Sequence, residues 1–534
     1  MDDIWSLFSR RPAAQRRAPK GTSRRLHLEQ LEERIAPSAD PVLDVTTGKG
    51  YTTIQAAIDA ANNGDIITVA PGTYNESVYL NKSVTLEGAQ YGVAGSSSSR
   101  TNPANESIVD NDDTPFQVAA SNVTIDGFAI EGSATQNNGG FGVFIGNNVS
   151  GTHVLDNIID NNIIGLGLAN TGASQAVVQD NLFLDNNNPG ASSGTAIYSD
   201  QNVSGGALKN VLIDHNAFLD NQNAGIELSS TDPSEGASDI TITNNVFDSN
   251  AQDLFLNNTT DATIANNSIL STISPASDGA GSAAIGLYGN DNNISILNNV
   301  LQNGTAYGIR IGDFNTGPSS NIAITDNSIA GFAAAGLRLD PGGYSGTLNA
   351  TGNYWGAATG PTSPNNPGGT GSVLDDAASQ VVFAPWLSSD ANSAPSGQPG
   401  FVGDSASLIS SNSSSSGSTA TRADLQQQVF SDLSLALQLQ SSGLDQAQQQ
   451  FGTWFYLAYS QSPPNAVSLV LDEIELTAET IMALEETMLG MSNTALLGNL
   501  AGLESAISDN PLTPTQAGQQ LLSLTGALVV AELL

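Results

Sequence analysis

Hydrophobic and polar residues alternate in short runs along the middle of the chain, and these runs recur. Each run has apolar residues at positions i and i+2, then an asparagine, and another apolar residue two positions after it. This alternation predicts a short strand with one buried face. The clearest copies are residues 240–247, 294–301 and 322–329; looser copies lie at 211–218 and around Asn157, Asn181 and Asn267.

The spacing of the recurrent asparagine predicts a solenoid. From Phe128, which takes its place in the first copy, to Asn353 in the last, the steps are 29, 24, 35, 29, 22, 32, 28 and 26 residues. A kernel repeated at such intervals is typical of stacked repeats. Asparagine suits a sharp corner, and its side chain can hydrogen-bond its equivalent in the next coil.

A second short apolar strand follows most copies of the kernel, and it begins at a glycine. These glycines are Gly142, Gly165, Gly225, Gly286, Gly308 and Gly336. Two strands per coil, with no helix between them, predict parallel strands stacked coil on coil. The leucine spacing and helical segments of a leucine-rich repeat are missing from the sequence. We therefore predict a mainly β fold, a parallel β-helix over residues 41–392.

The flanks of this region differ from it in composition. Apolar residues at 54, 57, 58 and 61 behind Thr53 predict a short helix that caps the first coil. Residues 1–40 form a basic arm, 393–423 a Ser/Gly-rich linker, and 424–534 a small α-helical domain with helices at 424–439, 466–491 and 515–533. The last of these is too short and polar to span a bilayer, so no membrane span is predicted. We expect a protein partner for these C-terminal helices.

Two stretches resemble known families. Residues 53–76, with Thr-Ile-Gln, Ala-Ile-Asp, Gly-Asp-Ile and Pro-Gly-Thr-Tyr, resemble the opening of the pectin-lyase-like superfamily, and the resemblance extends over about residues 50–386. The repeats are similar to the PbH1-type repeats of NosD-like domains, in which Gly-Asn-Tyr-Trp-Gly at 352–356 is a recurring closing phrase. The resemblance implies a right-handed β-helix.

The basic arm resembles an export-associated segment. Residues 24–37, Arg-Arg-Leu-His-Leu-Glu-Gln-Leu-Glu-Glu-Arg-Ile-Ala-Pro, are similar to the LEPR-type segment near the N-terminus of many bacterial exported and surface proteins. This resemblance implies a secreted or cell-surface bacterial protein. The alternative is a short amphipathic helix within a disordered basic arm.

The net charge of the chain limits the classes of partner that it can bind. Asp and Glu number 52 against 15 Lys and Arg, giving a formal charge of −37, and eight of the basic residues precede Pro37. So acidic a body repels phosphate, which argues against nucleic acid as a partner. The chain has no Cys, three His and four Met, so the copper-delivery role that a NosD-like resemblance suggests is disfavoured. We predict no cofactor, with Ca²⁺ as the alternative.

The residue between the two buried positions of the second strand points outward, and in successive coils it forms a column. That column contains Phe144, Gly167, Tyr198, Glu227, Phe255, Tyr288, Arg310 and Arg338. Coils stack about 4.8 Å apart, so these side chains form one stripe. Aromatic rings beside charged groups suit a polysaccharide groove. The alternative is that strand surfaces favour aromatics and that the arginines offset an acidic surface.

Catalysis at this stripe follows only from the family resemblance. Lyases of the superfamily use an Arg or Lys base with Asp residues, which Arg338, Asp313 and Asp340 approximate. An Asp after a strand is also ordinary turn chemistry. Pectin methylesterase activity is rejected, because neither the Gln-Asp-Thr nor the Arg-Pro-Trp motif of that family occurs.

Asp156 and Asp180, each just before a recurrent asparagine, are weak metal candidates. They would lie in adjacent coils, where like charges favour a bound Ca²⁺ or a raised pKa; solvated corner residues are the alternative.

The sequence thus leads to two hypotheses. One is an exported, carbohydrate-binding β-helix protein of the cell surface. The other is a polysaccharide-degrading enzyme, a lyase rather than a glycoside hydrolase, acting on uronate-containing glycans.

Overall fold

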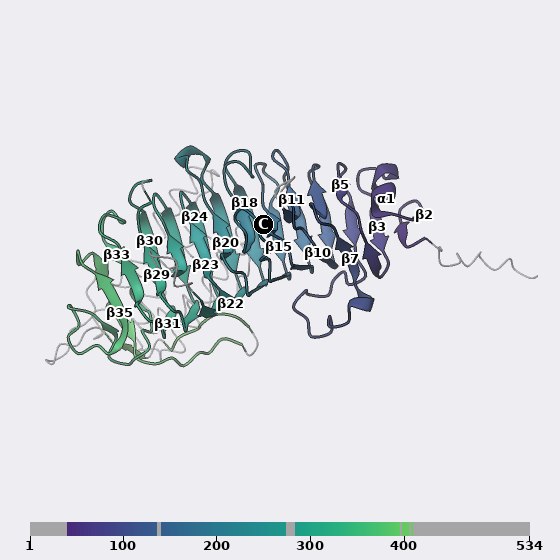
Figure 1. The fold of residues 1–534 in the computed structure, drawn as a ribbon. Helices are drawn as coiled ribbons and strands as arrows, with labels where there is room; N and C mark the ends of the chain where they lie inside the picture. Colours follow the sequence, from purple (N-terminus) through teal and green to yellow (C-terminus); the bar gives the residue numbers. More distant parts are fainter. Residues whose placement is uncertain are drawn as a thin grey trace, which may run out of the picture. The chain divides into compact units, whose positions relative to one another are not determined.

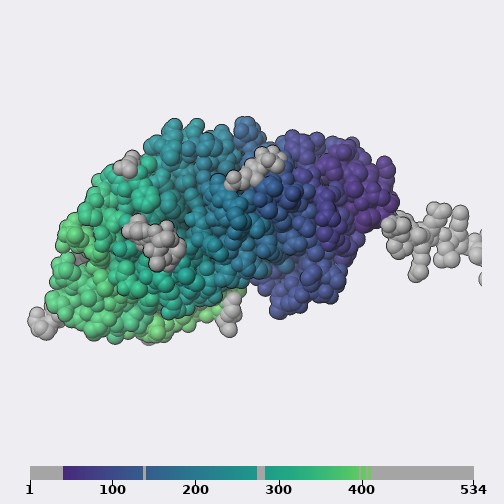
Figure 2. Space-filling view, viewed as in Figure 1, coloured from purple at the N-terminus to yellow at the C-terminus, as the bar shows by residue number. Residues whose placement is uncertain are grey.

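The computed structural model describes residues 40–135, 140–273, 283–314, 316–395, 398–404 and 407–409. Within these residues the strands form sheets of 14, 10 and 12 strands, here called sheets I, II and III, and one two-stranded sheet. Successive strands of one sheet come from successive coils (Figure 1). Figure 2 shows the same order as bands of colour along the β-helix.

Sheet I is parallel apart from β1, which pairs antiparallel with both β2 and β3. Its strands are, in order, β2 (Lys49–Tyr51), β1 (Val42–Asp44), β3 (Ile66–Val69), β6 (Thr85–Glu87), β9 (Thr124–Asp126), β12 (His153–Leu155), β15 (Ala176–Gln179), β18 (Lys209–Asp214), β21 (Ser238–Thr243), β24 (Thr260–Ala265), β27 (Asn292–Leu297), β30 (Ser320–Thr325), β33 (Leu348–Asn349) and β36 (Val381–Val382).

Sheet II holds the shorter strands that follow each asparagine corner. They are, in order, β31 (Ser328–Ala330), β28 (Val300–Gln302), β25 (Ser268–Thr272), β22 (Val246–Asn250), β19 (Ala217–Leu219), β16 (Leu182–Leu184), β13 (Ile158–Asp160), β10 (Phe128–Glu131), β7 (Ser107–Asp110) and β4 (Gly72–Tyr74).

Sheet III contains the strands that carry the recurrent glycines, together with strands that carry none of them. They are, in order, β34 (Pro361–Thr362), β35 (Gly371–Asp376), β32 (Ala335–Leu339), β29 (Tyr307–Ile311), β26 (Ala283–Leu287), β23 (Gln252–Leu256), β20 (Ala224–Leu228), β17 (Thr195–Ser199), β14 (Ile164–Gly167), β11 (Phe141–Ile145), β8 (Phe116–Val118) and β5 (Val78–Leu80).

Each regular coil therefore has three strands, whereas the alternation pattern predicted two. The kernel at 240–247 contains the end of β21, the asparagine corner and the start of β22, and β23 is the third strand. Strands of sheet II are often only three residues long, so a single buried residue such as Phe218 marks them. Period-two alternation cannot be recognised from one apolar position.

The recurrent asparagines form a continuous hydrogen-bonded ladder, as the sequence predicted. In each step, the backbone N–H and the Nδ2 group of one asparagine donate to Oδ1 of the next; from Asn216 to Asn245 the distances are 2.8 and 3.0 Å. The same Nδ2 group also donates to a carbonyl oxygen of the preceding coil, 2.8 Å from Val178 O in the case of Asn216. The members are Asn157, Asn181, Asn216, Asn245, Asn267, Asn299, Asn327 and Asn353.

The left-handed turn at this corner belongs to the residue before each ladder asparagine, and not to the asparagine itself. Positive φ values of 54° to 57° occur at Asp156, Asp180, His215, Asn244, Asn266, Asn298 and Asp326. Asn, Asp and His are enriched among non-glycine residues with this conformation, which explains the composition of the column. Gly352 (φ 72°) fills the same position before Asn353.

A second ladder, which we did not predict, lies at the corner between sheets II and III. Asn162, Asn186, Asn221 and Asn250 are joined by amide hydrogen bonds of 3.0 to 3.2 Å. Asn250 then donates to Asp253 Oδ1 at 3.0 Å, and Thr272 Oγ1 donates to Asp253 Oδ2. Burial raises the pKa of Asp253 to about 7.

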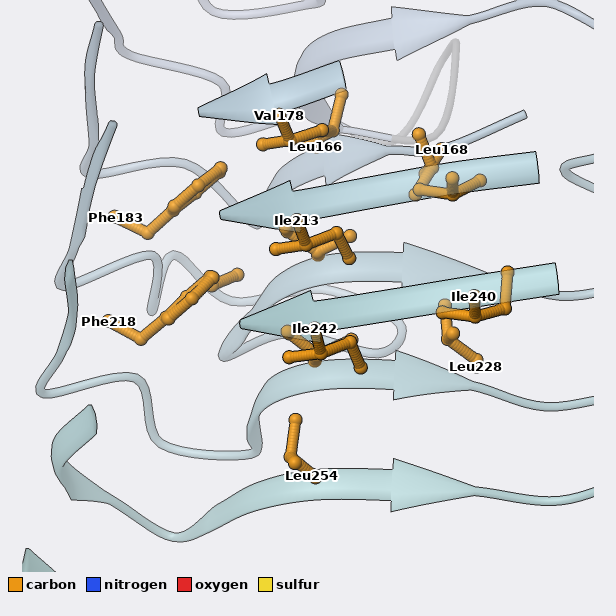
Figure 3. Packing of buried hydrophobic residues seen from close by; sticks show 14 of the residues in the cluster. Leu166, Leu168, Val178, Phe183, Ile213, Phe218, Leu228, Ile240, Ile242 and Leu254 are labelled. Atoms are coloured by element: carbon orange, nitrogen blue, oxygen red, sulfur yellow. The ribbon is translucent and has the colours of Figure 1, made fainter. Parts of the chain in front are cut away.

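The core consists of stacked inward-facing side chains, one layer per coil. Figure 3 shows Val178, Ile213 and Ile242 above one another from sheet I, with Phe183 and Phe218 stacked beside them. The rings of Phe218 and Phe247 are parallel to within 11°, with centroids 4.6 Å apart. These aliphatic and aromatic columns supply the apolar burial on which the solenoid depends.

The first coil is capped as predicted. Helix α1 (Ile54–Ala60) buries Ile54, Ala57 and Ile58 and packs against β1, β2, β3 and β5. Thr53 Oγ1 accepts the Ala56 N–H at 3.1 Å, and the carboxylate of Glu76 accepts the first two N–H groups of the helix. The helix thus covers the otherwise open end of the core. Two 3₁₀ turns, η1 (Pro103–Asn105) and η2 (Pro233–Glu235), lie in loops.

Beyond residue 392 the chain still packs on the β-helix. The Gly400 N–H donates to Ser268 Oγ, and the Phe401 N–H donates to the Asn298 carbonyl at 2.7 Å. Phe401 is buried, and β38 (Leu408–Ile409) pairs antiparallel with β37 (Trp386–Leu387). The first part of the predicted linker therefore contacts the coils.

Other predictions fall outside the described residues. These are the basic arm with its LEPR-type segment, the rest of the linker, and the helices of residues 424–534. Within the described ranges, no helix is both long and apolar enough to cross a membrane.

We expect Asn245→Ala to destabilise the protein, because the backbone N–H of buried Asn216 would lose its acceptor, its Nδ2 group one of three acceptors, and Ile213 O its side-chain donor. Unsatisfied buried groups of this kind should lower the free energy of unfolding by roughly 3 kcal/mol. Urea denaturation followed by circular dichroism measures the loss. Asn292→Ala, an exposed asparagine on β27, should change it by less than about 0.5 kcal/mol. Equal losses in both variants would contradict a stabilising ladder.

Candidate surface site on sheet III

The outward column of sheet III is in register over most of the β-helix. Direct strand partners join Phe144 to Gly167, Gly167 to Tyr198, Tyr198 to Glu227 and Glu227 to Phe255. Arg310 is the direct partner of Arg338. Of the strands that carry this column, β11, β20, β23 and β29 are labelled in Figure 1.

The prediction for Tyr288 is wrong, because Gly286 occupies the column in its coil. Gly286 pairs with Phe255 on one side and Arg310 on the other. Tyr288 lies just after β26, is 2 % exposed, and its ring covers Gly286 so closely that an added Cβ would lie 2.2 Å from the ring. The glycine thus makes room for a tyrosine that lies across the column.

The first half of the column is closed by contacts within the protein. The Phe144 ring packs on Phe141, with centroids 5.1 Å apart, and both rings lie over Gly167. The hydroxyl group of Tyr198 donates to Asp200 Oδ2 at 3.0 Å, and burial raises the pKa of Tyr198. These side chains are partly buried in their own contacts.

Glu227 lies between the two halves of the column. Its Oε2 accepts a hydrogen bond from Asn223 Nδ2 at 3.1 Å. Burial, with a contribution from the negative charge of Asp200, raises the pKa of Glu227 to about 7. The side chain therefore changes charge near neutral pH.

The second half forms one connected surface, which we call the aromatic–arginine patch. It consists of Phe255, Tyr288, Arg310, Phe314, Arg338, Asp340 and Asp375. The Phe314 ring stacks on Tyr288 at 4.5 Å and 15°, and it is 46 % exposed. The Phe255 ring contacts both of them, with its centroid 4.6 Å from that of Tyr288 and 6.1 Å from that of Phe314. The Arg310 guanidinium carbon is 6.0 Å from the Tyr288 centroid and 5.6 Å from that of Tyr307.

Two carboxylates hold the arginines of the patch. Arg310 donates from Nε and Nη2 to Asp340 Oδ2, at 3.0 and 2.7 Å. Arg338 donates from Nε to Asp340 Oδ1 at 2.7 Å and from Nη1 to Asp375. Because Arg310 and Arg338 are direct strand partners, Asp340 places a negative charge between two like charges.

The three candidate catalytic residues are only partly brought together. Arg338 contacts Asp340, but Asp313 Oδ1 accepts the backbone N–H groups of Thr316 and Gly317, each at 3.0 Å. Asp313 thus stabilises the turn that carries Phe314. The hydrogen bond from Arg338 to Asp340 raises the pKa of Arg338, which keeps its guanidinium protonated.

The weak metal candidates, Asp156 and Asp180, lie at the corner between sheets I and II. Burial, with the negative charges of Asp126 and Asp180, raises the pKa of Asp156 to about 6. Arg100, which is buried and paired with Glu106, donates to the backbone carbonyl of Asp156. Among the described residues, no group of three His, Asp or Glu side chains has an arrangement that could hold a metal ion.

Sequence reasoning missed two residues of the patch, Phe314 and Asp375, and also Tyr307, whose ring lies beside Arg310. Phe314 stands in a loop, where alternation gives no indication of direction. Asp375 lies on β35, beyond the Trp355 that we took as the end of the repeats. Residues 371–376, Gly-Ser-Val-Leu-Asp-Asp, show no alternation that could have revealed this last strand.

Parallel strands in three sheets, stacked through buried asparagine ladders, define a β-helical solenoid. The family described as right handed beta helix region matches residues 73–269 and 187–354, which together span more than half of the chain. The chain therefore belongs to the right-handed β-helix family.

One curated relative is the "Cell surface glycoprotein" of Methanothermus fervidus, 33 % identical over 129 residues. The match covers 24 % of this chain and 18 % of that protein, so the chain spans less than a fifth of the relative's length.

Solved structures of similar architecture include an epimerase module and a DFA-IIIase. The A-module of mannuronan C-5 epimerase AlgE6 from Azotobacter vinelandii is 16 % identical, with 60 % of this chain and 84 % of that chain covered and a TM-score of 0.37. DFA-IIIase from Arthrobacter chlorophenolicus A6 without its lid is also 16 % identical, with 62 % and 92 % covered and a TM-score of 0.38. At these identities the likeness concerns the fold alone.

Glu227→Gln should change how stability depends on pH. Since the folded-state pKa is about 7 against an ordinary 4.5, Glu227 takes up a proton on folding when the pH lies between these values. Its contribution to stability is present below pH 4.5 and is lost as the pH rises through 7. We expect the Tm of Glu227→Gln, relative to wild type, to rise between pH 4.5 and pH 8 in thermal scans.

The matched control is Glu235→Gln, the same chemical change in the turn η2 (Pro233–Glu235). Subtracting the Tm of one variant from the Tm of the other at each pH removes the effect of all other titrating carboxylates. A Tm difference that does not vary with pH would contradict the raised pKa of Glu227.

Proposed function

We propose that this protein is an exported, surface-associated β-helix protein that binds carbohydrate through the aromatic–arginine patch. The observation that carries the proposal is the exposed Phe314 ring fixed on buried Tyr288, beside a charged hydrogen-bonding network. An aromatic face packs on the C–H surface of a sugar ring, and neighbouring charged groups bind its hydroxyls. Because Tyr288 and Phe255 hold Phe314 in place, little side-chain freedom would be lost on binding.

The surface location is supported by the relative named cell surface glycoprotein and by the LEPR-like segment in residues 24–37. The strongly acidic composition keeps such a protein soluble and disfavours contact with anionic membranes. In this proposal the C-terminal segment 424–534 attaches the protein to a protein partner.

The rival function, a polysaccharide lyase with Arg338 as base, has less support. A general base must release its proton near the working pH. The hydrogen bond to Asp340 instead raises the pKa of Arg338, and Asp375 holds a second nitrogen of the same guanidinium. Asp313, the third residue of that hypothesis, is occupied by two backbone N–H groups.

Phe314→Ala in the full chain should weaken glycan binding about ten-fold, equivalent to roughly 1.4 kcal/mol, because the ring face that packs on the sugar is removed. A glycan array identifies the ligand, and titration calorimetry then gives the affinities. The matched control is Tyr91→Ala, which removes another exposed aromatic ring in the loop after β6. A ligand whose affinity falls equally in both variants would show that the patch is not the binding site.

A separate absorbance assay tests the lyase hypothesis. The full chain, incubated with uronate polymers and Ca²⁺, should give no increase in the ultraviolet absorbance of unsaturated products. An increase that Arg338→Ala abolishes, with the thermal stability of the variant retained, would establish the lyase and overturn the binding proposal.

A further inference from the structure

The charges of the aromatic–arginine patch balance within the patch itself. Its two positive groups, Arg310 and Arg338, face two negative groups, Asp340 and Asp375. The arginines are little exposed, with side-chain values of 14 % and 31 %, and each is bonded to at least one carboxylate. An incoming carboxylate would therefore meet guanidinium groups that are already neutralised.

The neighbourhood of the patch adds negative charge. Asp313 lies on the turn that carries Phe314, and Asp376 follows Asp375 on β35. Arg310 and Arg338 are the only arginines in the sequence between Arg100 and Arg422, within a chain of formal charge −37. A polyanionic ligand would have to approach against this field.

The unfilled hydrogen-bonding capacity at the exposed end of the patch suits hydroxyl groups. Arg338 Nη2 and Asp375 Oδ1 make no hydrogen bond within the described part of the chain. They lie on the two sides of one ion pair, so a donor and an acceptor are available next to each other. A sugar hydroxyl both donates and accepts, whereas a ligand carboxylate can only accept and would be repelled by Asp375.

We propose that the aromatic–arginine patch takes an uncharged glycan, in which sugar hydroxyls bind between Arg338 and Asp375 and a sugar ring packs on Phe314. This inference rests on the proposed carbohydrate function and differs from the uronate class that the resemblance to pectin-lyase-like proteins suggested. The charge of the site disfavours uronate and sulfated polymers. Packing on the Phe314 ring does not distinguish these polymers from uncharged sugars.

The test compares matched polymers that differ in charge. The full chain is titrated at low salt with methyl-esterified and de-esterified galacturonan, and with dextran and carboxymethyl-dextran. We expect binding to an uncharged member, with the carboxylated member of that pair bound at least ten-fold more weakly. Equal or tighter binding of the carboxylated member by wild type would overturn the inference and leave the proposed function standing. No binding to any of the four, or to any glycan on the array, would overturn the proposed function.

A second experiment uses the variant Asp375→Asn. It removes the negative charge of the acceptor that Arg338 Nη1 contacts and gives the patch a net positive charge, so the preference for the uncharged member should fall several-fold. Asp239→Asn on β21 of sheet I makes the same change in net charge away from sheet III and should leave the preference unchanged. Asp375 is 41 % exposed, and circular dichroism melts check that both variants fold. An unchanged preference in Asp375→Asn would contradict the role given to the Arg338–Asp375 pair.

Discussion

The structure depends on hydrogen bonding between asparagine side chains at a corner that water does not reach. A primary amide has two donors and one acceptor with two lone pairs, and each ladder position uses them to join three successive coils. A member such as Asn245 accepts two hydrogen bonds from Asn216 and donates to Asn267 and to a carbonyl oxygen. Few other side chains of this size can accept hydrogen bonds from one neighbouring coil and donate to the other at the same time. An unsatisfied buried amide is strongly unfavourable.

Fixing one corner allows the rest of each coil to vary in length. The ladder steps range from 22 to 35 residues, yet the strand partners of sheets I and III remain in register from coil to coil. The difference is taken up by the loops between the strands. The Asp313–Gly317 turn that carries Phe314 is one such loop, so the proposed site combines a rigid sheet with a variable connection.

The sequence allowed the fold to be predicted well and the site only in part. Asparagine spacing and alternation led to the β-helix, the capping helix and the register of six of the seven side chains placed in the outward column. The error at Tyr288 has a physical cause. A strand whose outward residue is glycine contains no side chain that marks its register, so the nearest aromatic was taken in its place. The sheet II strands were missed as separate elements because three residues are too few for a period to show.

The arginines of the patch show why a column of outward residues cannot be interpreted one residue at a time. Arg310 and Arg338 are direct neighbours across a strand pair, where two positive charges about 4.8 Å apart repel one another. The carboxylate of Asp340 lies between them and bonds to both, and Asp375 continues the alternation of charge into β35. The sheet can thus hold two arginines only as part of a neutral chain of ion pairs. Pairing the arginines with carboxylates lets the two coils stack, and it also removes the positive field that an anionic ligand would need. Hydrogen bonding and the exposed ring of Phe314 therefore remain as the means of recognition.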